Sequence, residues 1–480
     1  MSRVENPTRN TRALLLTGLC ACLAVSAVAQ DDAPEAAPPV DAAERQAVVQ
    51  RMGEQLVENY VFPDVAEKVA AHVKAELTAG AYDEITDAEA FADALTEAAR
   101  SVSHDKHMRV RAQTPRRAAE QRANPLRASA EAAARQRQGN YGFDKVEILD
   151  GNVGYLNMLG FAGTPDAQAT AVAAMTFLAN VDAIIFDMRE NGGGSPEMVR
   201  FVSSYLFDQR THLNSLYWRQ GDRTDEFWTL DELPSPRLGD GVPVFVLTSS
   251  YTFSGAEEFS YNLRTRDRAT LVGETTGGGA NPGGSMPVGE RFRMFIPTGR
   301  AINPITGTNW EGVGVEPHVK VEADKALEVA LPKAQEAAEA RRRSRLESFD
   351  AQWARLEEAQ QKAQGLLEAS ETDAAQAVIK EAVLQALSSG LADEGGINQL
   401  GYIYLQRDQG PLAIAAFQAN VESFPDSPNT YDSLGEAYME TGLNEAAIKN
   451  YRKSLELDPG NRNAVGMLER LGAPAPSDAH

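Results

Sequence analysis

Cysteine is almost absent from this sequence. The chain has 2 cysteines in 480 residues, Cys20 and Cys22, and both lie within the first thirty residues. If that leader is removed, the chain can form no disulfide and can use neither a thiol nucleophile nor a thiolate metal site. Nucleophilic catalysis would then have to come from a hydroxyl, an amine or a carboxylate.

Positive charge is also scarce. The chain has 46 Lys and Arg against 68 Asp and Glu, a formal net charge of −22, and no basic block stands out. A strongly acidic protein repels polyanions, so we expect no nucleic-acid partner. With 43% hydrophobic residues, the chain is long enough for roughly two to four globular domains.

Long apolar runs are missing as well, apart from one near the start. Three arginines precede an apolar run at 13–28, and a small-x-small site follows at 27–29. The run is shorter than the ~20 residues needed to span a bilayer. We therefore expect a signal peptide at 1–29, an exported protein in the periplasm or outside the cell, and no integral span after cleavage. A lipid-anchored form is less favoured, since Cys20 is unusual inside a lipoprotein box.

Periodicity divides the rest of the chain. Helical spacing dominates first, strands then alternate with helices, and helical spacing returns at the end. The predicted fold is an α/β core, a mixed sheet with crossover helices, between an N-terminal helical domain and a C-terminal all-α repeat domain. The expected segments are a linker at 30–40, the helical domain with a mobile segment at 41–139, the α/β domain at 140–332, a helical linker at 333–364 and the repeats at 365–475.

An internal repeat with a period of 34 residues marks the C-terminal part. The positions Leu400, Gly401, Tyr404, Phe417 and Pro425 recur as Leu434, Gly435, Tyr438, Tyr451 and Pro459. This stretch resembles tetratricopeptide repeats, which implies a surface for a protein partner.

Ser254 is the first candidate for chemistry. It follows a buried strand that ends near Thr248, and it opens a helix. Its hydroxyl is expected at the carboxyl edge of the sheet, where helix amides stabilise negative charge. The alternative is structural, because Ser254 and Glu257 also form an S-x-x-E capping box.

Three further segments carry polar groups. The glycines at 192–194 follow a buried strand and are suited to an oxyanion hole, although a plain turn would use them too. His104 and His107 offer a general base; they show no third metal ligand, and a surface turn is the alternative. Either Glu311 or Glu316 could orient the histidine, or neither.

Together these segments resemble the tail-specific, or C-terminal-processing, serine protease family. The likeness covers about 145–320, with the histidine segment upstream. Residues 246–258 resemble the nucleophile segment, 187–194 the D-x-R-x-N-x-G-G loop and 273–284 the G-E-T-x-G-G turn.

One departure narrows the resemblance. Many members carry a lysine in a T-F-G-K-G turn, whereas residues 275–279 contain none, so a serine–lysine dyad is not expected. The sequence is similar instead to the tricorn-like branch and to interphotoreceptor retinoid-binding proteins. The resemblance to that branch favours His107 over His104 as the histidine of the catalytic unit, and Glu311 over Glu316 as its glutamate. Ser103 or Lys106 could accompany the histidine, and no PDZ-like insertion is evident at 110–140.

The resemblance implies a serine endopeptidase acting on a protein or peptide substrate. Ser254 would be the nucleophile, His107 the base, Glu311 its orienting acid, and the amides of Gly255 and Gly193 the oxyanion hole. No cofactor and no metal are implied. The alternatives are a catalytically inactive lipid- or retinoid-like binding protein, and a scaffold in which the repeats are the function.

Overall fold

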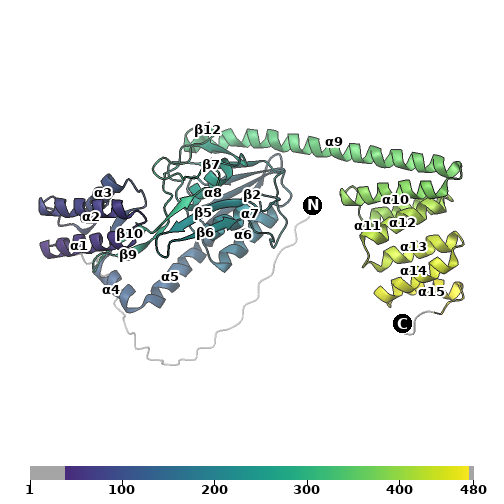
Figure 1. Ribbon diagram of the computed structural model, residues 1–480, viewed down its shortest axis with the longest axis horizontal. Coiled ribbons are helices and arrows are strands. Elements are labelled where there is room, and N and C mark those ends of the chain that lie inside the picture. Colours follow the sequence, from purple (N-terminus) through teal and green to yellow (C-terminus); the bar gives the residue numbers. More distant parts are fainter. Residues whose placement is uncertain (1–37, 475–480) are drawn as a thin grey trace, which may run out of the picture.

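The structure, a computed structural model, describes residues 38–474. The predicted signal peptide and most of the predicted linker at 30–40 lie outside these residues. Within them, no helix combines the length and the apolar character needed to cross a bilayer. Figure 1 shows an N-terminal helical domain, an α/β domain, one long helix and a helical repeat domain in chain order, which confirms the predicted fold class.

Three helices form the N-terminal domain: α1 (Ala42–Asn59), α2 (Pro63–Thr78) and α3 (Ala88–Ser103). Their apolar residues recur every three or four positions, so each helix buries one face in a shared core. Residues 115–138, inside the stretch predicted to include a mobile segment, form α4 (Pro115–Ala123) and α5 (Pro125–Gln138).

A three-stranded antiparallel sheet joins this domain to distant sequence. β1 (Arg109–Ala112) pairs with β10 (Phe292–Pro297), which pairs with β9 (Gly283–Pro287). Met294 and Ile296 of β10 are buried in the core of the helical domain. The pairing therefore brings the turn after α3 to the segments around residues 280 and 311.

The central sheet of the α/β domain has the strand order β12-β8-β7-β4-β3-β2 and is parallel except at β2. All residues of β4 and β7 are buried, as expected for strands covered on both faces. The strands are β2 (Phe143–Leu149), β3 (Val153–Met158), β4 (Ala183–Asp187), β7 (Val244–Thr248), β8 (Ala269–Gly273) and β12 (Val319–Lys320).

Helices cover both faces of this sheet. One face packs on α6 (Pro165–Phe177), α7 (Pro196–Ser204) and α8 (Gly255–Arg264). A smaller antiparallel sheet, β11 (Gly299–Ile302) with β5 (His212–Trp218) and β6 (Arg223–Trp228), adjoins the domain.

The other face packs on the first half of α9 (Ala326–Glu368). Four buried alanines at a spacing of four residues, Ala326, Ala330, Ala334 and Ala338, let the helix lie close to the sheet. The helix is longer than the linker predicted at 333–364, because its first half belongs to the α/β core.

The repeats follow on the far half of α9. Their helices are α10 (Thr372–Ser388), α11 (Glu394–Gln406), α12 (Gly410–Ser423), α13 (Pro428–Glu440), α14 (Asn444–Leu457) and α15 (Arg462–Arg470). At Gly401 a Cβ atom would lie 2.4 Å from the ring of Phe417, and at Gly435 it would lie 3.0 Å from Tyr451. The repeated glycines therefore mark the close contacts within each helix pair.

Candidate active site

Ser254 lies between β7 and α8, at the carboxyl edge of the central sheet. Its φ is 54° and its ψ −119°, a conformation that residues with side chains rarely adopt. Such backbone strain costs of order 1–3 kcal/mol and is concentrated at functional sites. It is also unlike the extended conformation of an ordinary N-cap serine. Ser254 and Glu257 also form the predicted capping box, so Ser254 begins α8 while its backbone departs from that of an ordinary cap.

The acid of the S-x-x-E pattern organises the turn. Glu257 is fully buried, and its Oε2 accepts from the amides of Ser254 (2.8 Å) and Gly279 (2.8 Å). Its Oε1 accepts from the Thr276 hydroxyl (2.5 Å) and the Gly278 amide (2.6 Å). Burial raises the pKa of Glu257, and these donors oppose that rise. One carboxylate thus ties the serine to the glycine-rich turn at 276–279.

The glycine loop touches the serine directly. At Gly193, where φ is 99°, a Cβ atom would lie 2.7 Å from the Gly255 nitrogen and 2.8 Å from the Ser254 Cβ. Only glycine permits this approach. The Gly193 amide donates to Oδ1 of Asn191 at 2.8 Å.

Asn191 is the asparagine of the D-x-R-x-N-x-G-G loop, but no role was predicted for it from the sequence; it is fully buried beside these residues. Its side-chain amide donates to the Met158 carbonyl (2.9 Å), and its own carbonyl accepts from the Phe253 amide (3.1 Å). It therefore holds the glycine loop to the segment that precedes Ser254.

His107 packs against the residue before the serine. Its ring lies 4.7 Å from that of Phe253 and 5.5 Å from that of Phe295, centroid to centroid. Burial, with a contribution from the charge of Arg100, lowers the pKa of His107 to about 4. The imidazole is therefore neutral near pH 7, and its buried Nδ1 has no hydrogen-bond partner among the described residues.

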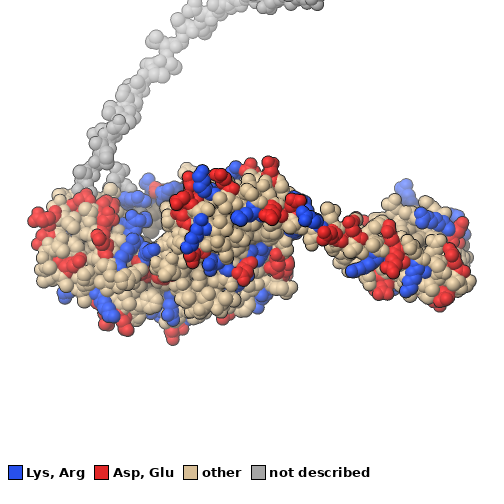
Figure 2. All heavy atoms as spheres, turned by 90° about the horizontal axis from the view of Figure 1, so that it is seen from above, with Lys and Arg blue, Asp and Glu red and all other residues tan. Residues whose placement is uncertain are grey.

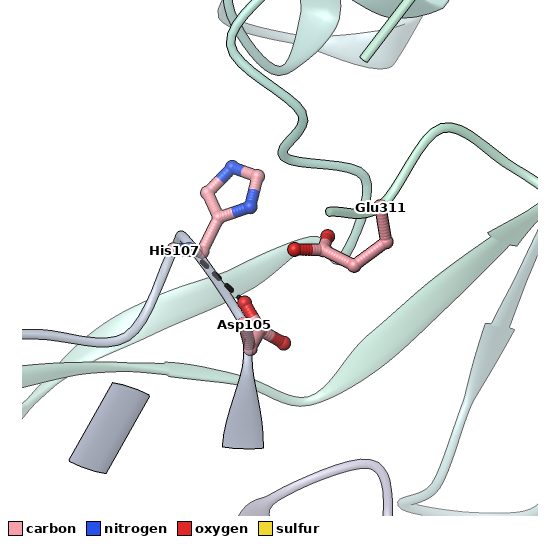
Figure 3. A group of neighbouring side chains, drawn as sticks. All are labelled: Asp105, His107 and Glu311. Atoms are coloured by element: carbon pink, nitrogen blue, oxygen red, sulfur yellow. Dashed lines mark hydrogen bonds between the residues drawn. The ribbon is translucent and has the colours of Figure 1, made fainter. Parts of the chain in front are cut away.

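Glu311 faces His107 across the turn. Its Oε1 accepts from the Lys106 amide (3.1 Å), and its Oε2 accepts from the amides of Ala280 (2.6 Å) and Asn281 (3.2 Å). Burial, together with the charge of Asp105, raises the pKa of Glu311 to about 7. Figure 3 shows the His107 ring and the Glu311 carboxylate pointing toward one another, with Asp105 close to both.

Asp105 is a second carboxylate that sequence reasoning missed. It accepts from the His107 amide (3.0 Å), from the Tyr60 hydroxyl (3.1 Å) and from the Asn281 side chain (2.9 Å). One ligand atom from each of Asp105, His107 and Glu311 lies within 4.8 Å of the other two. The carboxylate oxygens already accept from N–H and O–H groups, which suits an orienting role better than metal ligation.

The alternative candidates lie elsewhere. His104 is exposed at the end of α3, and Glu316 is an exposed residue that pairs with Lys320. Lys106, in contrast, reaches the site, where its Nζ donates to the Gly277 carbonyl at 2.6 Å. A lysine thus contacts the glycine-rich turn, but it comes from a segment far from that turn in sequence.

A cleft of about 1220 Å³ opens beside these residues. His107, Phe253, Gly192 and Gly277 line it, so it adjoins both the histidine and the serine segment. The rest of the lining is Arg100, Lys106, Arg109, Arg111, Ala112, Gln113, Arg117, Pro125, Ala128, Ser250, Tyr251, Ser285, Arg293 and Phe295.

Comparison with known families assigns the domains. Residues 152–321 match peptidase family S41, and residues 42–140 match the N-terminal domain of that peptidase in eukaryotic IRBP. Residues 428–461, which span α13 and α14, match the tetratricopeptide repeat. These matches define a class of protein with a mixed α/β domain, an N-terminal helical domain and C-terminal repeats. Residues 42–140 and 152–321 thus match two domains of one peptidase family, which confirms the resemblance seen in the sequence.

Individual relatives are distant. The carboxy-terminal-processing protease of Bartonella bacilliformis is 24% identical over 178 residues, which is 36% of this chain and 40% of that protein. The superkiller complex protein 3 of Mus musculus is 34% identical over 99 residues, 21% of this chain and 6% of that protein. The chain thus spans less than half the length of either relative. The solved structure of the photosystem II D1 C-terminal processing protease has a TM-score of 0.38 and 15% identity, and the match covers 59% of this chain and 94% of that one.

Proposed function

We propose that this chain is a serine endopeptidase that hydrolyses protein or peptide substrates through an acyl-enzyme on Ser254. The observation that carries the proposal is the convergence of four segments far apart in sequence. The loop at 191–194 contacts Ser254, which has a strained backbone; the His107 ring lies against the adjacent Phe253, and Glu311 lies beside His107.

In the proposed reaction, His107 accepts the proton of the Ser254 hydroxyl as that oxygen attacks the peptide carbonyl. A histidine with a pKa of about 4 is neutral, and so able to accept a proton, throughout the neutral range. The imidazolium that forms is stabilised by the carboxylate of Glu311 near the unpartnered Nδ1. His107 then protonates the leaving amine, and water hydrolyses the acyl-enzyme.

The amides of Gly255 and Gly193 are the proposed oxyanion hole. The Gly255 amide lies at the start of α8, where the helix dipole favours negative charge. The Gly193 amide donates to Asn191 in this structure. For the Gly193 amide to act in the oxyanion hole, its hydrogen bond to Asn191 must be replaced by one to the oxyanion.

Labelling with a serine-directed fluorophosphonate tests the proposal. We expect the full chain to be labelled and Ser254→Ala not to be. The control is Ser260→Ala, because Ser260 is a buried serine of the same helix whose hydroxyl donates to the Ala256 carbonyl. A wild-type chain that folds but takes no label and cleaves no peptide would contradict the proposal and favour a ligand-binding protein on the same fold.

Two finer parts of the proposal concern the ends of the chain. We propose that the segment 1–29 directs export, which N-terminal sequencing of the protein from the periplasm or medium would test. We also propose that the repeats hold a protein partner or a folded substrate.

A further inference from the structure

The cleft beside Ser254 has a charge opposite to that of the whole protein. Among the residues whose side chains the structure describes, six cationic ones line it and no Asp or Glu does, although the net charge of the chain is −22. These residues are Arg100, Lys106, Arg109, Arg111, Arg117 and Arg293. Figure 2 shows Lys and Arg side chains gathered where the N-terminal helical domain meets the α/β domain.

The strand β1 presents two of these arginines on one face. Its side chains alternate between exposed and buried, so Arg109 and Arg111 are exposed while Val110 is buried in the core of the helical domain. Across the ladder Arg111 lies directly opposite Arg293 of β10. Like charges at opposed positions destabilise a sheet, so this pairing has no structural benefit.

Among the side chains that the structure describes, none of the six cations forms an ion pair, and the hydrogen bonds of Arg100, Lys106 and Arg293 go to carbonyl or hydroxyl oxygens. The charges of Asp105 and Glu311 act on Arg100, and the charge of Arg117 acts on Glu131, without forming such a pair. The nearby acids Asp105 and Glu311 already accept from other donors and do not line the cleft. The positive charge therefore faces the space that a substrate would fill.

We infer that this cleft selects a polypeptide segment that carries carboxylates, an inference that rests on the proposed peptidase function. Arg109 and Arg111 are two residues apart on one strand, which places them about 7 Å apart. An extended peptide repeats its side chains at the same interval, so acidic residues at alternate positions match the pair. The carboxylates inferred here are those of Asp and Glu side chains, as distinct from the free C-terminus of a substrate.

Cleavage of matched peptides tests the inference. The panel holds one sequence with Glu at alternate positions, the same sequence with Gln, and each of these with a free or an amidated C-terminus. We expect kcat/KM to be roughly tenfold or more higher for the Glu peptide than for the Gln peptide at low salt, and this ratio to fall as ionic strength rises. A loss on Glu→Gln supports the inference, and a loss on amidation alone would overturn it by assigning the effect to the C-terminus. Equal rates for all four peptides would overturn the inference.

Charge-matched variants locate the effect. Arg109→Gln with Arg111→Gln should remove most of the preference for Glu over Gln. The control is Lys68→Gln with Lys74→Gln, which removes the same charge from exposed positions of α2 and should leave the preference unchanged. If both pairs lower the preference equally, the effect comes from net charge and not from the cleft.

A binding measurement distinguishes a failure of this inference from a failure of the proposed peptidase function. In full-length Ser254→Ala, fluorescence anisotropy should show tighter binding of the Glu peptide than of the Gln peptide. If that difference appears but wild type cleaves neither peptide, the cleft is selective and the peptidase proposal is wrong. If wild type cleaves both equally and the variant binds both equally, the peptidase proposal stands and the acidic preference is wrong.

Discussion

The cleft and the repeat domain carry opposite charge. Of the side chains described around the cleft, six are Lys or Arg and none is acidic, whereas residues 366–474 contain 7 Lys and Arg against 16 Asp and Glu. The net charge of the chain predicts the charge of neither the cleft nor the repeat domain, because it does not say where the charged residues lie in the structure. We therefore expect the two regions to recognise different chemistry, the cleft an acidic segment and the repeats a more basic one.

The largest expected effect is the loss of the proposed catalytic unit in the cleft region. Ser254→Ala and His107→Ala should each lower kcat by at least about 10³-fold, and the double variant should be no worse than either, because residues that act as a unit lose activity non-additively. Ser254→Ala should cost only about 1 kcal/mol of stability, as for a lost cap. Single-turnover hydrolysis of a short peptide measures the activity. Strictly additive losses would show that Ser254 and His107 do not act as one catalytic unit.

A smaller effect is expected from Glu257, which holds the turn at 276–279 in place but takes no part in the proposed bond changes. Glu257→Gln should destabilise the fold by about 1–3 kcal/mol, because a side-chain NH₂ would then face amide donors that the carboxylate now satisfies. Activity should fall by roughly 10–100-fold as the turn shifts.

The adjacent residue provides the matched control. Glu258 is also buried, and burial raises its pKa to about 7, yet it makes no contact with the turn at 276–279. Glu258→Gln should change activity less than threefold, as judged by kcat/KM and by thermal unfolding. Equal losses in the two variants would show that any buried charge in α8 matters and that the turn has no special part.

The pH dependence should follow Glu311. Its pKa of about 7 lies above the ordinary value of 4.5, so the unfolded chain ionises first as pH rises. Wild type should therefore lose stability between pH 4.5 and 7 relative to Glu311→Gln, by about 1–3 kcal/mol, and the difference should stay constant above that range. Denaturant unfolding at several pH values measures this loss.

Activity should show the opposite trend. If ionised Glu311 supports His107, wild-type kcat/KM rises through pH 7, and Glu311→Gln lacks that rise. A rise that persists in the variant would assign the titration to another group.

The smallest effect on peptide hydrolysis is expected from removing the repeats. A chain ending after Ser348 retains the half of α9 that packs on the sheet, as well as the pairs of Arg341 and Arg342 with Asp182. It should cleave a short peptide within about twofold of the full chain and lose selectivity for a folded or basic protein partner. A truncated chain that unfolds cooperatively yet cleaves nothing would make the repeats part of the catalytic machinery.

Local patterns are what the sequence by itself determined. The 34-residue period, the buried strands of the central sheet and the loops around Gly193 and Ser254 follow from short-range spacing, so the fold class and the family resemblance were predictable. Such patterns are carried by neighbouring residues, whose geometry depends little on the rest of the chain.

The family resemblance selected His107 and Glu311 as candidates, but only the tertiary structure shows which polar groups meet. The β1–β10 pairing brings His107 to Glu311, more than 200 positions away, and leaves His104 and Glu316 exposed. The roles of Asp105 and Asn191 were not predicted either. Each accepts from an amide two residues on, but each also bonds a distant group, Asn281 for Asp105 and Met158 for Asn191, that no local pattern encodes. The basic cleft has the same origin: arginines scattered through an acidic sequence line one surface only after strands from both ends of the peptidase region have paired.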